Sequence, residues 1–191
     1  MRKIVVSMHL SLDGFVAGPN GEMDWIIVDE IMFDFGARLT DNADTALYGR
    51  NTYQMMNSYW PTAAEQPEAT RHDIEHSRWF NSVKKIVLSS SMKGKVPDKT
   101  IVINDNVADE IKSIKQETGK DILIFGSPTA CHSLMQDDLI DDYWLFVNPV
   151  LLGNGIPLFG NITERTKLKL VSTKTFQSGV NCLHYERERV H

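Results

Sequence analysis

The chain has 191 residues, a net charge of −5 at pH 7 and an isoelectric point of about 5.7. Hydrophobic residues make up 42% of it and charged residues 24%, values ordinary for a globular protein. Its length favours one domain, which we expect to span residues 1–191. The acidic balance, without a cluster of lysines and arginines, argues against a nucleic-acid partner.

The sequence also argues against a metal centre, a disulfide framework and a membrane span. Cys131 and Cys182 both lie in apolar stretches, where buried free thiols are the expectation. No histidine and cysteine grouping has zinc spacing. No apolar run approaches the roughly 18 residues of a membrane span, and the chain opens on a strand-like run without a signal-peptide core. We therefore expect a cytoplasmic protein without bound metal or membrane partner.

In chain order, strand-like and helix-like patterns alternate. Residues 3–10 form the first expected strand, and apolar side chains at 28, 31, 32, 35 and 39 follow at the spacing of an amphipathic helix. The other expected strands are 44–48, 85–88, 100–103, 121–125 and 143–150, and the other helices are 52–59, one within 61–82, 107–117 and 129–135. Residues 168–176 and 181–188 alternate like an antiparallel hairpin. This order predicts an α/β domain with a mainly parallel sheet and an antiparallel edge.

The loop after the first strand, "SLDGFVAGPNGEMDW", is unusual because it keeps large apolar side chains among its glycines. A loop that only reverses the chain needs glycine, proline and asparagine, all of which are present here. Phe15, Val16, Met23 and Trp25 are not needed for a turn. They indicate either that this loop covers a bound molecule or that they anchor it to the core.

Three expected strands end in small or hydroxyl residues. These ends read Gly49-Arg50-Asn51-Thr52, Ser89-Ser90-Ser91 and Gly126-Ser127-Pro128-Thr129-Ala130. Ligands of α/β sheets bind beyond the carboxyl ends of strands, and a following helix presents free amides to a phosphate. Arg50 adds a bidentate phosphate donor. Together the ends favour a phosphorylated cofactor, although each one taken alone also fits a plain turn or a solvated loop.

These segments, taken in order, resemble a known family. The runs LDGFVAG, MDW, LYGRNTY, KKIVLSSS and ILIFGS are similar to the dihydrofolate-reductase-like family. The resemblance is closest to the reductase domain of the bifunctional riboflavin-biosynthesis deaminase–reductases and to its stand-alone relatives, whose late strand and loop resemble DDYWLFVNPVLLGNGIPLF. It covers about residues 3–160. It implies a three-layer dihydrofolate-reductase-like fold with a mainly parallel central sheet, and NADPH as the cofactor.

The resemblance also implies cofactor contacts at the three strand ends and in the opening loop. That loop resembles the flexible loop that closes over nicotinamide and substrate. Pro128 departs from the family, which usually has Gly-Gly in the second diphosphate loop, and it removes a backbone donor. The implied positions are Gly49, Arg50 and Thr52 at the diphosphate, Ser89 and Ser90 near the 2′-phosphate, Gly126, Ser127, Thr129 and Ala130 in the second diphosphate loop, and Val16 and Ala17 beside the nicotinamide.

The candidate catalytic groups are three carboxylates. Asp13 either closes the turn to Gly14 or holds the substrate or the nicotinamide ribose. Dihydrofolate reductases carry a carboxylate on the first helix, and gapless counting from Trp25 places it at Glu30. Helical periodicity puts Glu30 opposite the apolar stripe and Asp29 beside it. The sequence therefore does not decide which of these groups is the proton donor.

The resemblance predicts an NADPH-dependent oxidoreductase that transfers a hydride to a small heterocyclic or sugar-derived substrate. The expected enzyme resembles the 5-amino-6-(5-phosphoribosylamino)uracil reductase of riboflavin biosynthesis. The zinc motif of the deaminase half is not in this sequence, so the reductase activity alone is expected. The alternatives are a dihydrofolate reductase and a non-catalytic NADP-binding protein.

A homodimer is expected from the run DDYWLFVNPVLL. An apolar strand of this kind at a sheet edge is an aggregation hazard, which pairing across a two-fold axis would remove. The reductase relatives are typically dimers. The alternative is that a neighbouring strand of the same chain covers it.

Overall fold

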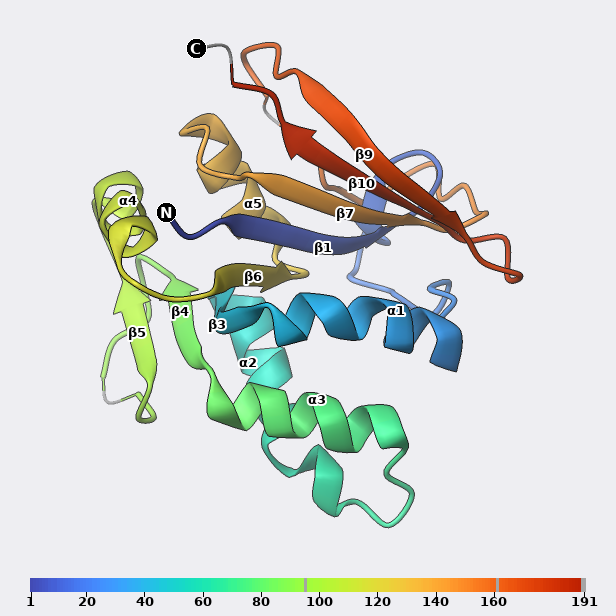
Figure 1. The fold of residues 1–191 in the computed structure, drawn as a ribbon, viewed down its shortest axis with the longest axis horizontal. Helices are drawn as coiled ribbons and strands as arrows, with labels where there is room; N and C mark the ends of the chain where they lie inside the picture. Colours follow the sequence, from blue (N-terminus) through green and yellow to red (C-terminus); the bar gives the residue numbers. More distant parts are fainter. Residues whose placement is uncertain (95, 161, 190–191) are drawn as a thin grey trace. The chain divides into compact units, whose positions relative to one another are not determined.

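The computed structural model describes residues 1–94, 96–160 and 162–189, and these form a mixed α/β fold (Figure 1). The chain divides into two compact units. The first unit contains residues 1–2 and 29–123. The second contains residues 3–28 and the described part of 124–191.

The first unit is built on three parallel strands covered by helices. Strand β4 pairs in parallel with β3 on one side and with β5 on the other. In this register Gly49 pairs with Leu88, so β3 and β4 end side by side. The elements of this unit are α1 (Glu30–Asp41), β3 (Ala43–Gly49), α2 (Arg50–Tyr59), the 3-10 helix η1 (Trp60–Glu65), α3 (Arg71–Ser82), β4 (Lys84–Leu88), β5 (Thr100–Ile103) and α4 (Val107–Gln116).

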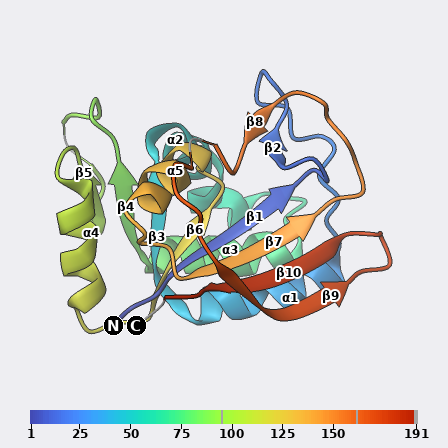
Figure 2. The same ribbon diagram turned by 90° about the horizontal axis from the view of Figure 1, so that it is seen from above.

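The second unit combines a parallel pair with the C-terminal hairpin. Strand β1 runs parallel to β7, and β10 runs antiparallel to both β7 and β9. Figures 1 and 2 show the long β9–β10 hairpin in orange and red. The elements are β1 (Ile4–Leu10), β2 (Phe15–Ala17), α5 (Pro128–Gln136), β7 (Asp142–Val147), β8 (Ile156–Pro157), β9 (Leu168–Thr175) and β10 (Asn181–Arg187), while β6 (Asp121–Phe125) runs from the first unit into the second.

This architecture confirms the predicted fold class, a mostly parallel sheet with an antiparallel hairpin. The pattern of strands and helices expected from the sequence recurs with shifts of a few residues at the element ends. The prediction missed the short strands β2 and β8, which pair with each other inside segments expected to be loops. Their pairing joins residues about 140 positions apart, which no local sequence pattern reveals.

The first helix starts later than the hydrophobic spacing predicts, and its apolar stripe is only partly buried. Asp29 caps α1, because its Oδ1 accepts a hydrogen bond of 2.8 Å from the Met32 amide. Met32 and Leu39 are buried, but the side chain of Ile31 is 61% exposed. The expected stripe therefore contains both core residues and surface residues.

The apolar strand β7 is not at a sheet edge, so the expected reason for a dimer is wrong. Residues 142–147 of β7 are paired on both sides, with β1 and with β10. Strand β7 is thus an interior strand, and the alternative, cover by strands of the same chain, is the observed one. Its apolar composition reflects burial inside one chain and says nothing about assembly.

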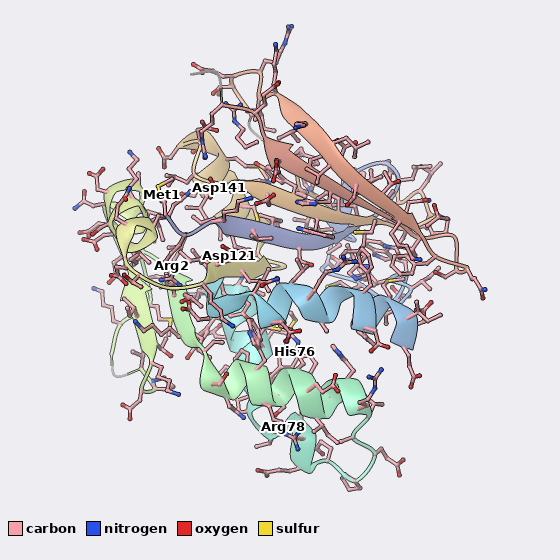
Figure 3. All side chains as sticks on the ribbon, in the orientation of Figure 1. Met1, Arg2, His76, Arg78, Asp121 and Asp141 are labelled. Atoms are coloured by element: carbon pink, nitrogen blue, oxygen red, sulfur yellow. The ribbon has the colours of Figure 1, made fainter. Side chains whose placement is uncertain are left out.

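Polar side chains hold residues near the start and near residue 189 in place. In the first unit, the Arg2 guanidinium is almost fully buried and donates to Asp44, to Thr45 Oγ1 (2.6 Å) and to the Lys120 carbonyl (2.7 Å). In the second unit, Asp141 accepts from the Ile4 amide (2.8 Å) and from Arg189 (2.6 Å). Figure 3 labels Arg2 and Asp141 among all described side chains.

The cysteines, the metal-ligating side chains and the helices of the described residues bear on three expectations from the sequence. Cys131 and Cys182 are both buried and free of any disulfide. Within residues 1–94, 96–160 and 162–189, no three histidine, cysteine or acidic side chains gather as metal ligands do. The same residues include no helix with the length and apolar character needed to cross a bilayer.

Candidate functional site

In the first unit, the ends of β3 and β4 bring two of the predicted cofactor segments together. Arg50 is the first residue of α2 and follows Gly49 at the end of β3. Its Nη1 donates a hydrogen bond of 2.9 Å to the Ser91 hydroxyl, which lies just beyond β4. The guanidinium is thereby held over the serine run at an exposed edge. A basic group beside hydroxyls suits an anionic ligand.

Within the serine run, the three serines have different environments. The Ser89 hydroxyl accepts from the Met92 amide (3.0 Å), and its carbonyl accepts from the Asn104 side chain (2.6 Å), so Ser89 shapes the turn. Ser90 is exposed. Ser91 was not among the predicted contacts, although it is the third serine of the same run. The side chain that holds Arg50 therefore lies one residue beyond the predicted pair.

Among the α-helices of the described residues, α2 and α5 differ from the others because their first turns carry no acidic side chain. The first turns of α1, α3 and α4 carry acidic side chains: Glu30, Asp73, and the pair Asp109 and Glu110. Those of α2 and α5 carry none. An acidic first turn stabilises its own helix but repels a bound anion. The two acid-free starts are the two that the sequence predicted as diphosphate contacts.

The start of α5, in the second unit, is a tight turn in left-handed backbone. Gly126 has φ +64° and Ser127 has φ +60°. Glycine adopts this region without cost, whereas a residue with a Cβ is strained there. Pro128 then occupies the start of α5, where a missing amide donor costs the helix no bond. Its presence therefore leaves the helix intact, and Thr129 and Ala130 follow in the first turn.

The opening loop of the second unit is held by a second loop. Val16 and Ala17 are buried, with exposed fractions of 7% and 6%, and lie in β2. Strand β2 pairs with β8, which belongs to the glycine-rich segment after β7 (Figure 2). Phe15 pairs with Pro157, and Ala17 pairs with Ile156. The apolar residues at 15–17 are thus half or fully buried strand residues, whereas Met23 is 44% exposed.

The three candidate carboxylates are all engaged locally or exposed. Asp13 accepts hydrogen bonds from the Ser11 hydroxyl and from two amides of the segment after β7. These hydrogen bonds lower the pKa of Asp13 below its usual value, and the bond from the Ser11 hydroxyl has the largest effect. Asp29 caps α1, and Glu30 is exposed in the first turn of that helix. Their catalytic assignment stays a prediction.

One buried residue of this region was not predicted from the sequence. Asn148 has no exposed surface, and its side chain bonds the carbonyls of Leu10 and Phe146 and the amide of Ile27. It thereby fixes the end of the opening loop beside the ends of β1 and β7. The only sequence signal was a polar residue after an apolar strand, just before Pro149.

His9 lies beside this asparagine. Its ring stacks on Phe146 with centroids 5.0 Å apart, and its Nδ1 lies 3.4 Å from the Asn148 amide nitrogen. Burial lowers the pKa of His9 to about 4. The imidazole is therefore neutral at pH 7 and is a poor source of protons there.

The arrangement of a mostly parallel sheet, helix starts at the carboxyl ends of strands and a paired opening loop defines a dihydrofolate-reductase-like α/β protein. Residues 2–182 match the family model of the RibD C-terminal domain. The chain therefore belongs to the RibD C-terminal domain family, a family of riboflavin-pathway-type reductases, which indicates an oxidoreductase in general.

Two relatives of Bacillus subtilis (strain 168) span nearly the same length. The uncharacterized protein YyaP is 37% identical over 183 residues, which cover 94% of this chain and 92% of YyaP. The uncharacterized protein YwjB is 32% identical over 187 residues, covering 97% of this chain and 98% of YwjB. Both therefore share the whole domain, and neither brings an assigned activity.

Solved structures show the same fold. A protein of Shewanella sp. PV-4, provisionally assigned to riboflavin biosynthesis, has a TM-score of 0.77 and 26% identity, with 99% of this chain and 100% of that chain covered. A pyrimidine reductase-like protein of Corynebacterium diphtheriae has a TM-score of 0.68 and 15% identity, covering 99% and 93%.

A third solved structure is a bifunctional protein. The diaminohydroxyphosphoribosylaminopyrimidine deaminase/5-amino-6-(5-phosphoribosylamino)uracil reductase of Thermotoga maritima has a TM-score of 0.66 and 15% identity. The match covers 97% of this chain but 56% of that one, so it corresponds to a part of the larger protein. At this identity the likeness concerns the fold.

Proposed function

We propose that the chain is an NADPH-dependent reductase that acts on a small heterocyclic or sugar-derived substrate. The observation that carries this proposal is the Arg50–Ser91 pair at the acid-free start of α2. A guanidinium held beside serine hydroxyls matches the chemistry of a 2′-phosphate, which NADPH has and NADH lacks. Membership of a reductase family supports the same proposal.

The described residues fit the parts of this cofactor in each unit. In the first unit, Gly49 and Thr52 at the start of α2 offer amides to a diphosphate, while Arg50 with Ser90 and Ser91 offers a positive charge and hydroxyls to the 2′-phosphate. In the second unit, Val16 and Ala17 offer a dry apolar surface to a nicotinamide. The cofactor supplies the hydride when bound. The protein's part is to bind, to orient and to exclude water.

The substrate is proposed by analogy with the relatives. The Thermotoga maritima protein carries 5-amino-6-(5-phosphoribosylamino)uracil reductase in its name. A planar heterocycle attached to a sugar phosphate is therefore the first candidate for this chain. Reduction of dihydrofolate is less supported, because Asp29 is engaged as a helix cap and Glu30 is exposed.

The test of the proposed function is a fluorescence titration with NADPH and with NADH, followed by an NADPH oxidation screen. The screen uses aminopyrimidine, dihydrofolate and carbonyl substrates. We expect tighter binding of NADPH than of NADH, and oxidation with one substrate class. Equal affinities, or no quenching by either dinucleotide, contradict the cofactor assignment. Binding without oxidation in any class favours a non-catalytic NADP-binding protein.

We also propose that the protein is a cytoplasmic homodimer. In the second unit, β9 is the last strand of the sheet and pairs with β10 on one side, and its Leu170 and Val171 are about half exposed. An open edge with apolar side chains is suited to pairing with a second copy. Light scattering at micromolar protein concentration measures the molar mass, and we expect the mass of a dimer. If only the mass of a monomer is found, the dimer is contradicted.

A further inference from the structure

Two loops of the second unit behave as one structural element. The Leu12 amide donates to the Val150 carbonyl (2.8 Å), and the Leu158 amide donates to the Gly14 carbonyl (3.1 Å). Between these bonds lies the β2–β8 pair. The opening loop and the segment 150–158 are thus joined by backbone hydrogen bonds along their lengths.

Asp13 lies at one end of this paired element and fastens it with its side chain. Its Oδ1 accepts from the Leu152 amide (3.1 Å) and from the Ser11 hydroxyl (2.7 Å). Its Oδ2 accepts from the Gly153 amide (2.7 Å). Gly153 has φ +73°, and such a turn points successive amides toward one acceptor. The carboxylate is therefore bound by the protein's own donors on both oxygens.

The Ser11 hydroxyl completes this arrangement. It donates to Asp13 and accepts from the Phe15 amide at 2.9 Å, and Ser11 is almost fully buried. A hydroxyl that donates to a carboxylate and accepts from an amide has its proton fixed on the carboxylate side. Asp13 is thereby linked through Ser11 to the first residue of β2.

The two loops lie too close for small displacements to be absorbed between them. A Cβ added at Gly155 would lie 2.3 Å from the Ala17 carbonyl oxygen and 3.2 Å from the Phe15 Cβ. His132 of α5 also contacts this pair, with its Nε2 3.1 Å from the Pro157 carbonyl oxygen. A shift of the 152–153 turn is therefore passed to β2, where Val16 and Ala17 lie.

We propose that Asp13 is a positioning residue, which binds the Leu152 and Gly153 amides and so sets the place of Val16 and Ala17. This inference rests on the proposed function, because those two residues are the ones assigned to the nicotinamide. It assigns Asp13 no proton transfer and no contact with the substrate. The loss of Asp13 then affects the nicotinamide half of the cofactor and leaves the adenosine half alone.

The experiment compares Asp13→Asn with the wild-type protein and with Asp137→Asn as the matched control. Asp137 is exposed and directly follows α5. Its substitution makes the same chemical change as Asp13→Asn, but away from the paired loops. Affinities are measured for NADPH and for 2′,5′-ADP, which has the 2′-phosphate but no nicotinamide. Amide hydrogen exchange is followed at residues 152–156 and 158, since Pro157 has no amide hydrogen, with β1 and β7 as the check that the variant is folded.

For Asp13→Asn we expect faster exchange at 152–156 and 158, NADPH binding weaker by roughly tenfold, and unchanged binding of 2′,5′-ADP. Asp137→Asn is expected to match the wild type in all three. Faster exchange with unchanged NADPH binding overturns the inference, because Asp13 is then a structural contact alone. Unchanged exchange overturns it as well. A wild-type protein that binds neither nucleotide contradicts the proposed function, and the positioning role fails with it.

Discussion

The two regions proposed to bind the cofactor are built in different ways. At the ends of β3 and β4, the contact between segments is a single side-chain bond, from Arg50 to Ser91, at an exposed edge. In the opening loop, the contacts to residues 150–158 are mostly backbone bonds with buried side chains among them. A side-chain site tolerates change in its surroundings and is sensitive to one residue. A backbone site is insensitive to most side chains and sensitive to any residue that alters the chain path.

The largest expected effect belongs to the side-chain region. Arg50→Ala removes the positive charge at the start of α2, and we expect NADPH binding to weaken by about 1.5–3 kcal/mol, as for a lost charged hydrogen bond. Ser91→Ala keeps the charge and loosens its placement, so a smaller loss is expected. Fluorescence titration of both variants measures this. Arg78→Ala is the matched control, because it removes one arginine charge from the exposed surface of α3 instead of from the start of α2. Figure 3 shows Arg78 and His76 on different sides of α3.

If Arg50→Ala binds NADPH as the wild type does, the side-chain region is not the phosphate site. A loss of the same size in Arg78→Ala would indicate a general effect of charge instead. Either result removes the observation that carries the proposed function.

The backbone region is tested by a glycine. Gly155→Ala places a Cβ against the Ala17 carbonyl, so β2 and β8 have to separate, and we expect a loss of about 1–3 kcal/mol of stability. Gly36→Ala is the control, because Gly36 lies within α1 and a Cβ added there would have no heavy atom within 4 Å. Removing a helical glycine is expected to stabilise by about 0.5–1 kcal/mol. Urea unfolding of both variants measures the difference, and equal midpoints contradict the close approach.

These two regions were not equally visible in the sequence. Gly49-Arg50 and the serine run were predicted because strand ends, glycine and arginine are local signals. The sequence also indicated most helices and strands, since their hydrophobic spacing is local too. The Asp13 bonds to residues 152–153 and the burial of Asn148 depend on contacts more than 100 positions apart. Such contacts have no periodicity, so only the structure shows them.

The same limit explains what was wrong about β7. Its apolar run predicts an exposed edge strand, yet two neighbouring strands of the same chain, β1 and β10, cover it. Composition tells whether a strand is buried, but it does not tell what buries it. Likewise, spacing placed Ile31 on the apolar face of α1, where the structure exposes it.

Each unit contains a half-buried histidine whose pKa is lowered, so the effect of low pH on stability can be followed through one histidine in each unit. Burial, followed by the charge of His72, lowers the pKa of His76 to about 3, and the ring lies between Trp60 and Trp79 with centroid distances of 4.2 and 5.2 Å. In the unfolded chain the pKa is about 6.5. Protons therefore bind the unfolded state first, and the stability is lost as the pH falls from about 6.5 toward 3.

Between pH 6.5 and 5.5 this histidine is expected to cost about 1 kcal/mol of stability. His9 of the second unit, with its pKa near 4, acts with the same sign in this range. His76→Gln removes the first contribution and leaves the second. Urea unfolding at the two pH values measures the remaining slope. A slope in His76→Gln equal to that of the wild type shows that His76 is not buried neutral.

The smallest expected effect concerns local opening of the loop that joins β2 to α1. Residues 15–17 are paired with β8. Among the described residues, the hydrogen bonds of the tip, residues 18–26, lie within the tip itself, such as Gly18 N to Glu22 O (2.8 Å) and Asn20 N to the Glu22 carboxylate (2.9 Å). If the tip closes over the nicotinamide, its amides from Asn20 to Asp24 should exchange fast in the free protein and slow with NADPH. The amides of residues 15–17 should be protected in both states, because their backbone pairing does not depend on cofactor. Hydrogen exchange measured with and without saturating NADPH distinguishes the behaviour of the tip from that of residues 15–17. Unchanged exchange at the tip means that the loop is static, with the half-buried Trp25 as its anchor. Fast exchange at residues 15–17 means that the whole opening loop moves as one lid.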